Sequence, residues 1–201
     1  MFIFNSLLGL FGYKRLYNLL KKYKKNINSY IISIINSIFT FSISLLNLYH
    51  KLDNSKWNAL IGFTQGYLYF DLFLSFKEKN IAMIVHHLFM SLTLFSPQYI
   101  DYINIDIPNL NYILSRIYIC EFSNVFLHTT VILYKLGKTN NKYFTLLKML
   151  TLLSYITLRV YNFTWIEYYL FIKKYYICFY LMLPVTFLNY YWFFKLLMKR
   201  T

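Results

Sequence analysis

Apolar residues along this chain gather into windows of about 20 positions, and short polar stretches separate the windows. A helix of that length crosses a hydrocarbon core about 30 Å thick. Lipid offers no water to the backbone, so a spanning segment must be a helix or a strand of a closed barrel, and barrel strands need only about 10 residues. The pattern therefore predicts an all-α polytopic membrane protein with six spans, at residues 28–48, 57–76, 81–100, 111–133, 143–165 and 176–197.

Residues 1–26 follow a different pattern. The apolar stretch MFIFNSLLGLFGY is too short to cross, and it lacks the leading positive charges of a secretory signal. A basic face and an apolar face then follow at helical spacing, which is typical of a helix lying in the membrane interface; a solvated basic tail is the alternative. We expect a basic amphipathic segment over 1–26 and a transmembrane domain over 27–201. The basic face carries Lys14, Asn18, Lys21, Lys22 and Lys25, opposite Leu16, Leu19, Leu20 and Tyr23.

Composition and charge agree with a membrane protein. Hydrophobic residues make up 58% of the chain and charged residues 14%, whereas soluble domains carry about 25% charged residues. Of the 21 Lys and Arg residues, 14 fall in loops and terminal segments on one side of the predicted spans and four on the other. An excess of Lys and Arg marks the cytosolic side, so both termini are predicted to be cytosolic. This basic face attracts anionic lipid, and nucleic acid is not an expected partner because no soluble domain is left to bind it.

Histidine, aspartate and glutamate side chains suit zinc or non-haem iron, but their arrangement in the sequence argues against a metal site. Both cysteines, Cys120 and Cys178, lie inside predicted spans, which leaves no disulfide framework and no Cys-rich zinc site. The four histidines lack the HxxxH and HxxHH spacings of histidine-rich membrane hydroxylases and desaturases. We therefore expect no metal and no bound cofactor.

Ionisable and polar side chains nevertheless occur inside the predicted spans. At 1.5 Å per helical residue, four of them lie roughly 8 to 9 Å from the same boundary and can form one layer. Others share one face of the fourth or fifth span, and these faces should point inward because a charged residue facing lipid costs about 2.5–3.5 kcal/mol. Such residues indicate either function or structural ion pairing. The layer comprises Asp71, His86, His87 and His128, and the shared faces comprise Glu121, Asn124 and His128, then Lys148, Thr151, Tyr155, Arg159 and Asn162.

Neighbouring positions within these sets should have different partners. Arg116 and Glu121, five residues apart, point about 140° apart on a helix, so each needs its own partner, and Glu121 can meet Arg159 or Lys148. For Lys148 and Arg159, both near a helix end, we favour a structural role.

The adjacent histidines cannot point at one spot either, because successive helical residues project about 100° apart. His87 shares its face with Ser91, whereas His86 shares its face with Met83 and Met90. We expect His87 to be the more cavity-directed imidazole, with Asp71 as the acid at matching depth, and His86 to pack against a neighbouring helix.

Three stretches together resemble the TLC domain over about residues 28–198: GYLYFDLFLSF, IVHHLFMSLTLF and LSRIYICEFSNVFLH. The elements most specific to that family are the aspartate, the histidine pair and the arginine ahead of an acidic motif. The resemblance implies a six-helix bundle that encloses a polar, lipid-accessible cavity. It makes His86, His87 and Asp71 the candidate catalytic residues, and Arg116, Glu121, Asn124, His128, Tyr155 and Arg159 the polar layer of the cavity.

The ceramide synthases of that family resemble this chain only in part. Their His-Asp-x-Ser-Asp signature falls on CEFSN, where Cys120 replaces the histidine and Asn124 the second acid, and their downstream Leu-Glu falls on Leu127 and His128. The pattern is closer to that of the small TLC-domain-containing proteins.

Three functions are therefore expected as alternatives. The first is binding of membrane lipids or regulation of lipid composition. The second is ceramide-synthase-like N-acyl transfer, in which a histidine deprotonates the nucleophile or accepts the acyl group; acyl-CoA is a co-substrate only in this case. The third is help in the insertion or assembly of other membrane proteins. The family's usual location, the endoplasmic reticulum, is the expected address.

Overall fold

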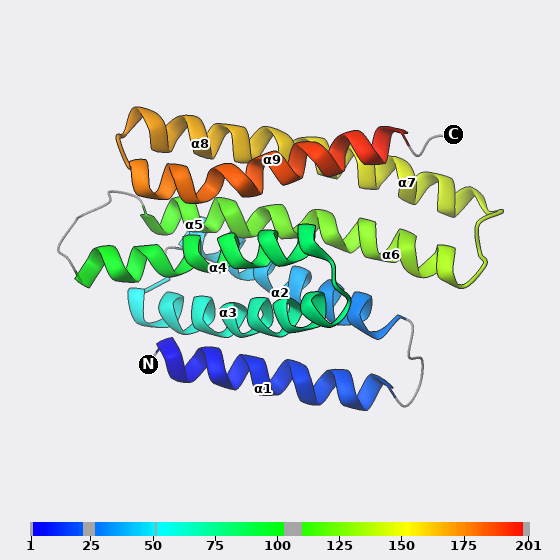
Figure 1. The fold of residues 1–201 in the computed structure, drawn as a ribbon, viewed down its shortest axis with the longest axis horizontal. Helices are drawn as coiled ribbons and strands as arrows, with labels where there is room; N and C mark the ends of the chain where they lie inside the picture. Colours follow the sequence, from blue (N-terminus) through cyan, green and yellow to red (C-terminus); the bar gives the residue numbers. More distant parts are fainter. Residues whose placement is uncertain (1, 22–26, 51, 103–109, 199–201) are drawn as a thin grey trace.

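The computed structural model describes residues 2–21, 27–50, 52–102 and 110–198, and all regular elements within these ranges are helical, which confirms the all-α prediction. The helices run side by side along one long axis and form an elongated bundle (Figure 1). In chain order the elements are α1 (Phe2–Lys21), α2 (Asn28–His50), α3 (Asn54–Lys77), α4 (Ile81–Tyr102), α5 (Leu110–Ile119), η1 (Cys120–Phe122), α6 (Ser123–Lys135), α7 (Lys142–Ser154), η2 (Tyr155–Tyr161), α8 (Asn162–Ile172) and α9 (Tyr176–Met198).

Four helical stretches of the described chain are long and apolar enough to cross a membrane: Asn28–Tyr49, Asn111–Lys135, Lys142–Ile172 and Tyr176–Met198. The predicted count of six is not confirmed. The windows at 57–76 and 81–100 do form helices, α3 and α4, but the described apolar part of α4 is short and α3 carries polar residues such as Gln65 and Asp71. Gln65 is buried between helices, so the polarity of α3 lies on an inner face.

Two of the long stretches are not uniform α-helices. The 3-10 turn η1 interrupts the stretch between α5 and α6, and the π-helix η2 joins α7 to α8. The predicted span at 143–165 also ends too early, because the helix continues to Ile172. Asn162 and Glu167 are buried against neighbouring helices, so these polar residues do not mark a boundary with water.

The first helix is a packed part of the bundle. Helix α1 runs beside α3 in the same direction (Figure 1), with Phe2 next to Gly62 and Ser6 next to Gly66. Tyr13 is buried, and its hydroxyl donates a hydrogen bond to Asn36 Oδ1 at 2.9 Å. This differs from the amphipathic segment expected on the surface. The prediction used the basic and apolar faces of residues 14–25. The buried face of the helix lies nearer the N-terminus and is formed by Ser6, Gly9 and Tyr13.

The described chain begins and ends at opposite ends of the bundle (Figure 1). Phe2 lies near Gly62, in the first half of α3, whereas Leu196 of α9 lines a cavity together with Glu78, directly after α3. The charge count along the sequence, by contrast, predicts both termini on one side.

Small polar residues bring α2 close to its neighbours. Ser33, Ser37, Thr40 and Ser44 lie buried on one face of the helix, and α2 packs there against α5, η1 and α6. The Thr40 hydroxyl donates to the Asn36 carbonyl and the Ser44 hydroxyl to the Thr40 carbonyl, so neither group is left unsatisfied. Small hydroxyl side chains of this kind allow helices in membranes to approach closely.

Candidate functional site

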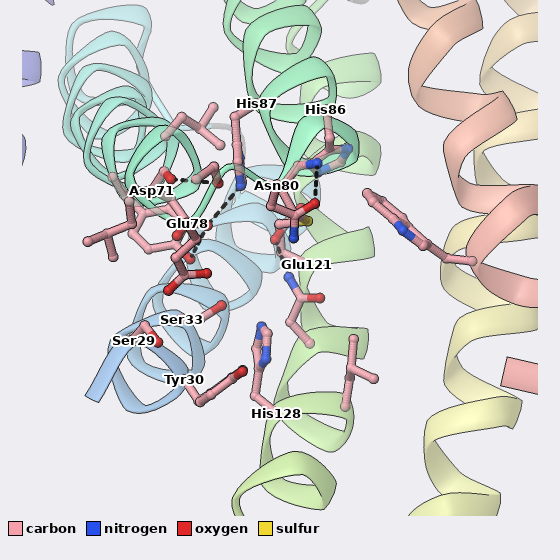
Figure 2. A pocket seen from close by; sticks show the side chains of 18 of the residues that line it. Ser29, Tyr30, Ser33, Asp71, Glu78, Asn80, His86, His87, Glu121 and His128 are labelled. Carbon is pink, nitrogen blue, oxygen red and sulfur yellow. Dashed lines mark hydrogen bonds and ion pairs between the residues drawn. The ribbon is translucent and has the colours of Figure 1, made fainter. Parts of the chain in front are cut away.

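A cavity of about 320 Å³ lies between α2, α3, α4, α6, η2 and α9. Its lining is mixed, with apolar residues such as Leu68, Leu74 and Leu127 beside titratable groups. The exposed residues Glu78, Asn80 and Lys195 line its outer part, at the end of the bundle where α3 turns into α4. Figure 2 shows this cavity with the labelled side chains converging on it from several helices.

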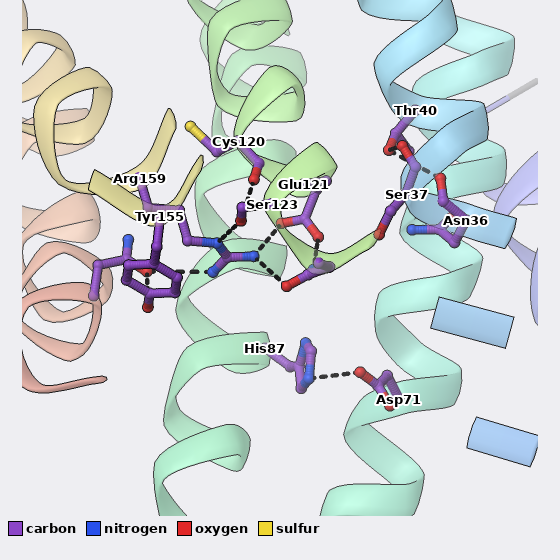
Figure 3. A network of polar contacts seen from close by, with 12 residues as sticks. Asn36, Ser37, Thr40, Asp71, His87, Cys120, Glu121, Ser123, Tyr155 and Arg159 are labelled. Atoms are coloured by element: carbon purple, nitrogen blue, oxygen red, sulfur yellow. Dashed lines mark hydrogen bonds and ion pairs between the residues drawn. The ribbon is translucent and has the colours of Figure 1, made fainter. Parts of the chain in front are cut away.

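The pair of His87 and Asp71 occupies one wall of the cavity. His87 Nε2 lies 2.9 Å from Asp71 Oδ2, and the Tyr67 hydroxyl donates to the same oxygen at 3.2 Å. Figure 2 and Figure 3 both show the imidazole and the carboxylate pointing toward one another. Asp71 and His87 lie equally far from the tight turn over residues 78–80, which places them at the same depth on antiparallel helices.

The turn that sets this depth is specified locally. Lys79 adopts a positive φ of 55°, and the Asn80 side chain accepts a hydrogen bond from the backbone N–H of Met83 in the first turn of α4. Such a cap satisfies one of the free N–H groups at a helix start. A shift of one residue here would rotate His87 away from Asp71 by about 100°.

His86 and His87 face different neighbours. The His86 ring meets Trp192 of α9 edge-on, with 5.2 Å between ring centroids. The structure therefore places His87 against Asp71 and His86 against a neighbouring helix, although both rings line the cavity. Nδ1 of each imidazole is buried and has no hydrogen-bond partner among the described residues. Nε2 of His87 is likewise without a hydrogen bond there, so its contact with Asp71 is close in distance but does not have the geometry of a hydrogen bond.

His128 lies on another wall of the cavity, on α6. Its ring packs against Tyr30 of α2 with 5.4 Å between centroids, and its Nδ1 likewise has no partner in the described part of the chain. The four side chains of the predicted layer, Asp71, His86, His87 and His128, thus border one cavity.

Arg159 holds the second polar cluster together (Figure 3). Its Nε donates to Ser123 Oγ at 2.7 Å, its Nη2 to Asn124 Oδ1 at 2.9 Å, and its Nη1 to Asn189 Oδ1 at 3.3 Å. The carboxylate of Glu121 lies 3.5 Å from Nη2 and accepts a hydrogen bond from Asn124 Nδ2 at 2.6 Å. Glu121 thus meets Arg159, and Lys148 lies exposed elsewhere.

The irregular helical segments position this cluster. Tyr155 and Arg159 come from the π-helix η2, whereas Glu121 comes from the 3-10 turn η1 with Ser123 and Asn124 directly after it. A π-helix changes the direction of side chains relative to an α-helix and is frequent at functional sites. Ser123 and Asn189 are partners of Arg159 that the sequence pattern did not predict. Asn189 is a single amide in an apolar window, which was its only signal.

Arg116 does not belong to the cavity, contrary to the prediction that placed it in the polar layer. Its Nε donates to Asn162 Oδ1 at 2.8 Å, its Nη1 donates to the Tyr112 hydroxyl at 3.0 Å, and its guanidinium lies over the ring of Trp165 at 4.0 Å. The contacts with Asn162 and Trp165 hold α5 to α8, whereas Tyr112 belongs to α5 itself. The helical spacing predicts that the side chains of Glu121 and Arg116 point in different directions. The tertiary structure adds their partners: Arg116 meets α8 and Glu121 meets Arg159 of η2.

The two clusters differ in what they can do chemically. An imidazole whose Nε2 is held by a carboxylate offers the lone pair of Nδ1 to a proton or to an electrophile, as a general base or nucleophile. Arg159 has no comparable capacity because a guanidinium stays protonated and offers no lone pair. Within the described residues, no group of three or more His, Cys, Asp or Glu side chains is placed to hold a metal ion.

Comparison with known proteins agrees with this architecture. The family model of the TLC domain matches residues 26–198. No curated protein and no solved structure matches the chain. The matched range includes every helix that lines the cavity and leaves out α1, and it shows that this membrane protein belongs to the TLC domain family.

Proposed function

We propose that this protein handles membrane lipids by taking the polar end of an amphiphile into the cavity, where His87 acts as a general base in acyl transfer. The observation that carries the proposal is the contact of 2.9 Å between His87 Nε2 and Asp71 Oδ2 at the cavity wall. The carboxylate of Asp71 beside Nε2 favours a proton on that nitrogen, which leaves the lone pair on Nδ1. That nitrogen is buried without a partner among the described residues, as expected of a group that serves a ligand.

The reaction balances with an acyl thioester, such as acyl-CoA, and an amine or hydroxyl of a lipid. Nδ1 removes the proton of the nucleophile as the nucleophile attacks the acyl carbonyl carbon. The bond from that carbon to sulfur then breaks, and the thiolate takes the proton back from the imidazolium. His87 returns to its starting state, with Asp71 stabilising the imidazolium in between.

The lining of the cavity suits such a pair of substrates. Ligand sites commonly combine an apolar lining with a few placed polar groups, and this cavity has both. The outer part carries Lys195, and Lys135 lies over the ring of Tyr30, another lining residue, at 4.7 Å. These two lysines favour an anionic group such as a phosphate of the thioester or of a lipid head group, although the acidic Glu78 lies in the same outer part.

The proposed setting is a membrane that all six helical segments of the TLC domain cross, α3 and α4 included, in the endoplasmic reticulum. Helices α3 and α4 have 24 and 22 residues and lie alongside the four apolar stretches, of which the shortest has 22 residues. The polar side chains of α3 that count most against insertion, Gln65 and Asp71, face neighbouring helices. The end with Lys195 and Lys135 faces the cytosol, where it attracts anionic lipid.

A second function, lipid binding without turnover, is favoured by the cluster around Arg159. The ceramide synthase signature has an acid where this chain has Asn124, and here Asn124 is engaged by both Arg159 and Glu121. A polar group with fixed internal partners stabilises the cavity wall and is not available to a substrate.

Turnover by the purified protein in lipid nanodiscs decides between these functions. The protein is incubated with long-chain acyl-CoA and a set of lipid amines and alcohols, and the products are identified by mass spectrometry. His87→Ala should lower the rate by roughly 10²–10⁴-fold in protein that still folds, and the exposed Lys148→Ala serves as a control. Full turnover in folded His87→Ala would exclude the base, whereas saturable binding of the same lipids without any product would indicate a binding protein.

A further inference from the structure

Helix α1 lies outside the range that matches the TLC domain and contributes no residue to the cavity lining. Its presence is therefore explained neither by the TLC domain nor by the cavity. It nevertheless packs closely against α3. A Cβ on Gly9 would overlap the carbonyl oxygen of Phe63, and a Cβ on Gly66 would overlap the carbonyl oxygen of Ser6. A Cβ on Gly62 would lie 2.9 Å from the carbonyl oxygen of Phe2. The backbones of α1 and α3 are thus in direct contact.

This contact fixes the direction of α1. Glycines or other small residues four apart, here Gly62 and Gly66, are typical of close contacts between helices in membranes. The contact continues along the helix as Tyr13 packs on Phe63 and Tyr67, with ring centroids 5.3 and 5.2 Å apart. A helix lying in the membrane interface would cross the bundle axis, whereas α1 runs along that axis (Figure 1).

The outer face of α1 is apolar in its first half. Ile3, Phe4 and Phe11 are 69%, 67% and 63% exposed, and Leu7 and Leu8 lie exposed between them. This apolar face continues the outer surface of the bundle, where Phe73 of α3 is 62% exposed. Lipid acyl chains are the partner that fits such a surface.

The charged residues of α1 all lie in one half of the helix. Residues 1–13 carry no charged side chain, and Lys14, Arg15 and Lys21 follow in the second half of the helix. A positive flank on the C-terminal side of an apolar segment retains that side in the cytosol. At 1.5 Å per residue the 20 residues of α1 reach about 30 Å, the thickness of the hydrocarbon core, and Lys14 and Arg15 can extend toward the interface.

We infer that α1 is a further membrane-crossing helix, with its outer face against lipid acyl chains. The N-terminus and the C-terminus then lie on opposite sides of the membrane. The chain then crosses the membrane once more than the six times expected from the sequence, which makes the number of crossings odd. This inference does not depend on what the cavity binds or catalyses.

Glycosylation tags in sealed microsomes test the topology. One tag is placed at the N-terminus and one at the C-terminus, and two internal tags calibrate the sides: one in the turn after Gly137, one in the turn at Lys173. The N-terminal tag should be modified together with the tag at Lys173, while the other two stay unmodified. An N-terminal tag that behaves like the C-terminal tag would overturn the inference.

Two matched glycine substitutions test the packing itself. Gly66→Ala should lower the melting temperature of the full chain by roughly 4–10 °C, because its Cβ would meet the backbone of α1, including Leu10 N at 2.5 Å. Gly12→Ala should leave the melting temperature unchanged or slightly raised, because its Cβ would meet nothing within 4 Å and alanine favours a helix. Equal melting temperatures for the two variants would contradict a packed α1.

Discussion

The clusters around His87 and Arg159 lie in the same cavity and differ in how far their polar groups are satisfied (Figure 3). The guanidinium of Arg159 donates to Ser123, Asn124 and Asn189 and lies near Glu121. The imidazole of His87 has the carboxylate of Asp71 2.9 Å from Nε2, but neither of its nitrogens makes a hydrogen bond within the described residues. Three helical stretches meet at Arg159, whereas His87 and Asp71 join only two neighbouring helices.

The difference separates a structural role from a chemical one. A buried polar group costs free energy unless it is hydrogen-bonded, so the guanidinium of Arg159, whose acceptors are supplied by the chain, stabilises the fold. A buried nitrogen without a partner forgoes that gain, and binding of a ligand can recover it. Loss of Arg159 should therefore affect folding, and loss of Asp71 should affect lipid handling.

The largest effect is expected from Arg159→Met. The substitution leaves Glu121 as a buried carboxylate without its cation, a change that typically costs about 3–5 kcal/mol in free energy of unfolding. Thermal unfolding in detergent and protein yield measure the loss. Lys148→Met, which removes an exposed cation from the same long helical stretch, should change the stability by less than about 0.5 kcal/mol. Wild-type stability of Arg159→Met would show that the cluster is not structural.

An intermediate effect is expected from Asp71→Asn, and on lipid handling. The amide keeps the shape of Asp71 but loses the charge-assisted contact with His87, worth about 1.5–3 kcal/mol, which corresponds to roughly 10- to 100-fold in turnover or lipid affinity. The control is Asp53→Asn, an exposed carboxylate paired with Lys56 at 2.8 Å ahead of α3. An equal loss of activity in both variants would contradict a chemical role for the His87 cluster. So would a loss of stability in Asp71→Asn as large as that in Arg159→Met.

The smallest effect is expected from His86→Phe. A phenyl ring keeps the edge-on contact with Trp192, and Nδ1 of His86 has no hydrogen bond to lose within the described residues. The free energy of unfolding, followed by the melting temperature, should change by less than about 1 kcal/mol. His86→Ala should instead lose the ring contact, worth about 0.5–1.5 kcal/mol, and the packing around it. Turnover reduced as far in His86→Phe as in His87→Ala would assign both imidazoles to the chemistry.

The pairing of His87 with Asp71 was accessible from the sequence because it depends on local counting. Both residues lie the same number of positions from one tight turn, and a helix rises by a constant 1.5 Å per residue. The pairing of Glu121 with Arg159 was foreseen as one of two options, because inward-facing charges of opposite sign at similar depth attract. Lys148 was the other option, and the sequence alone did not distinguish the two.

The helices of this chain follow from the length of its apolar windows, and the membrane class follows from their composition, because both are properties of consecutive residues. The partners of Arg159 and the separation of Arg116 depended on the rotation of each helix against its neighbours. The π-helix η2 and the 3-10 turn η1 alter that rotation, and a regular helical count cannot include them. The position of α1 depended on close contact at Gly9, Gly62 and Gly66. Close contact between backbones requires a matching surface on the second helix, and a pattern within one helix does not contain that surface.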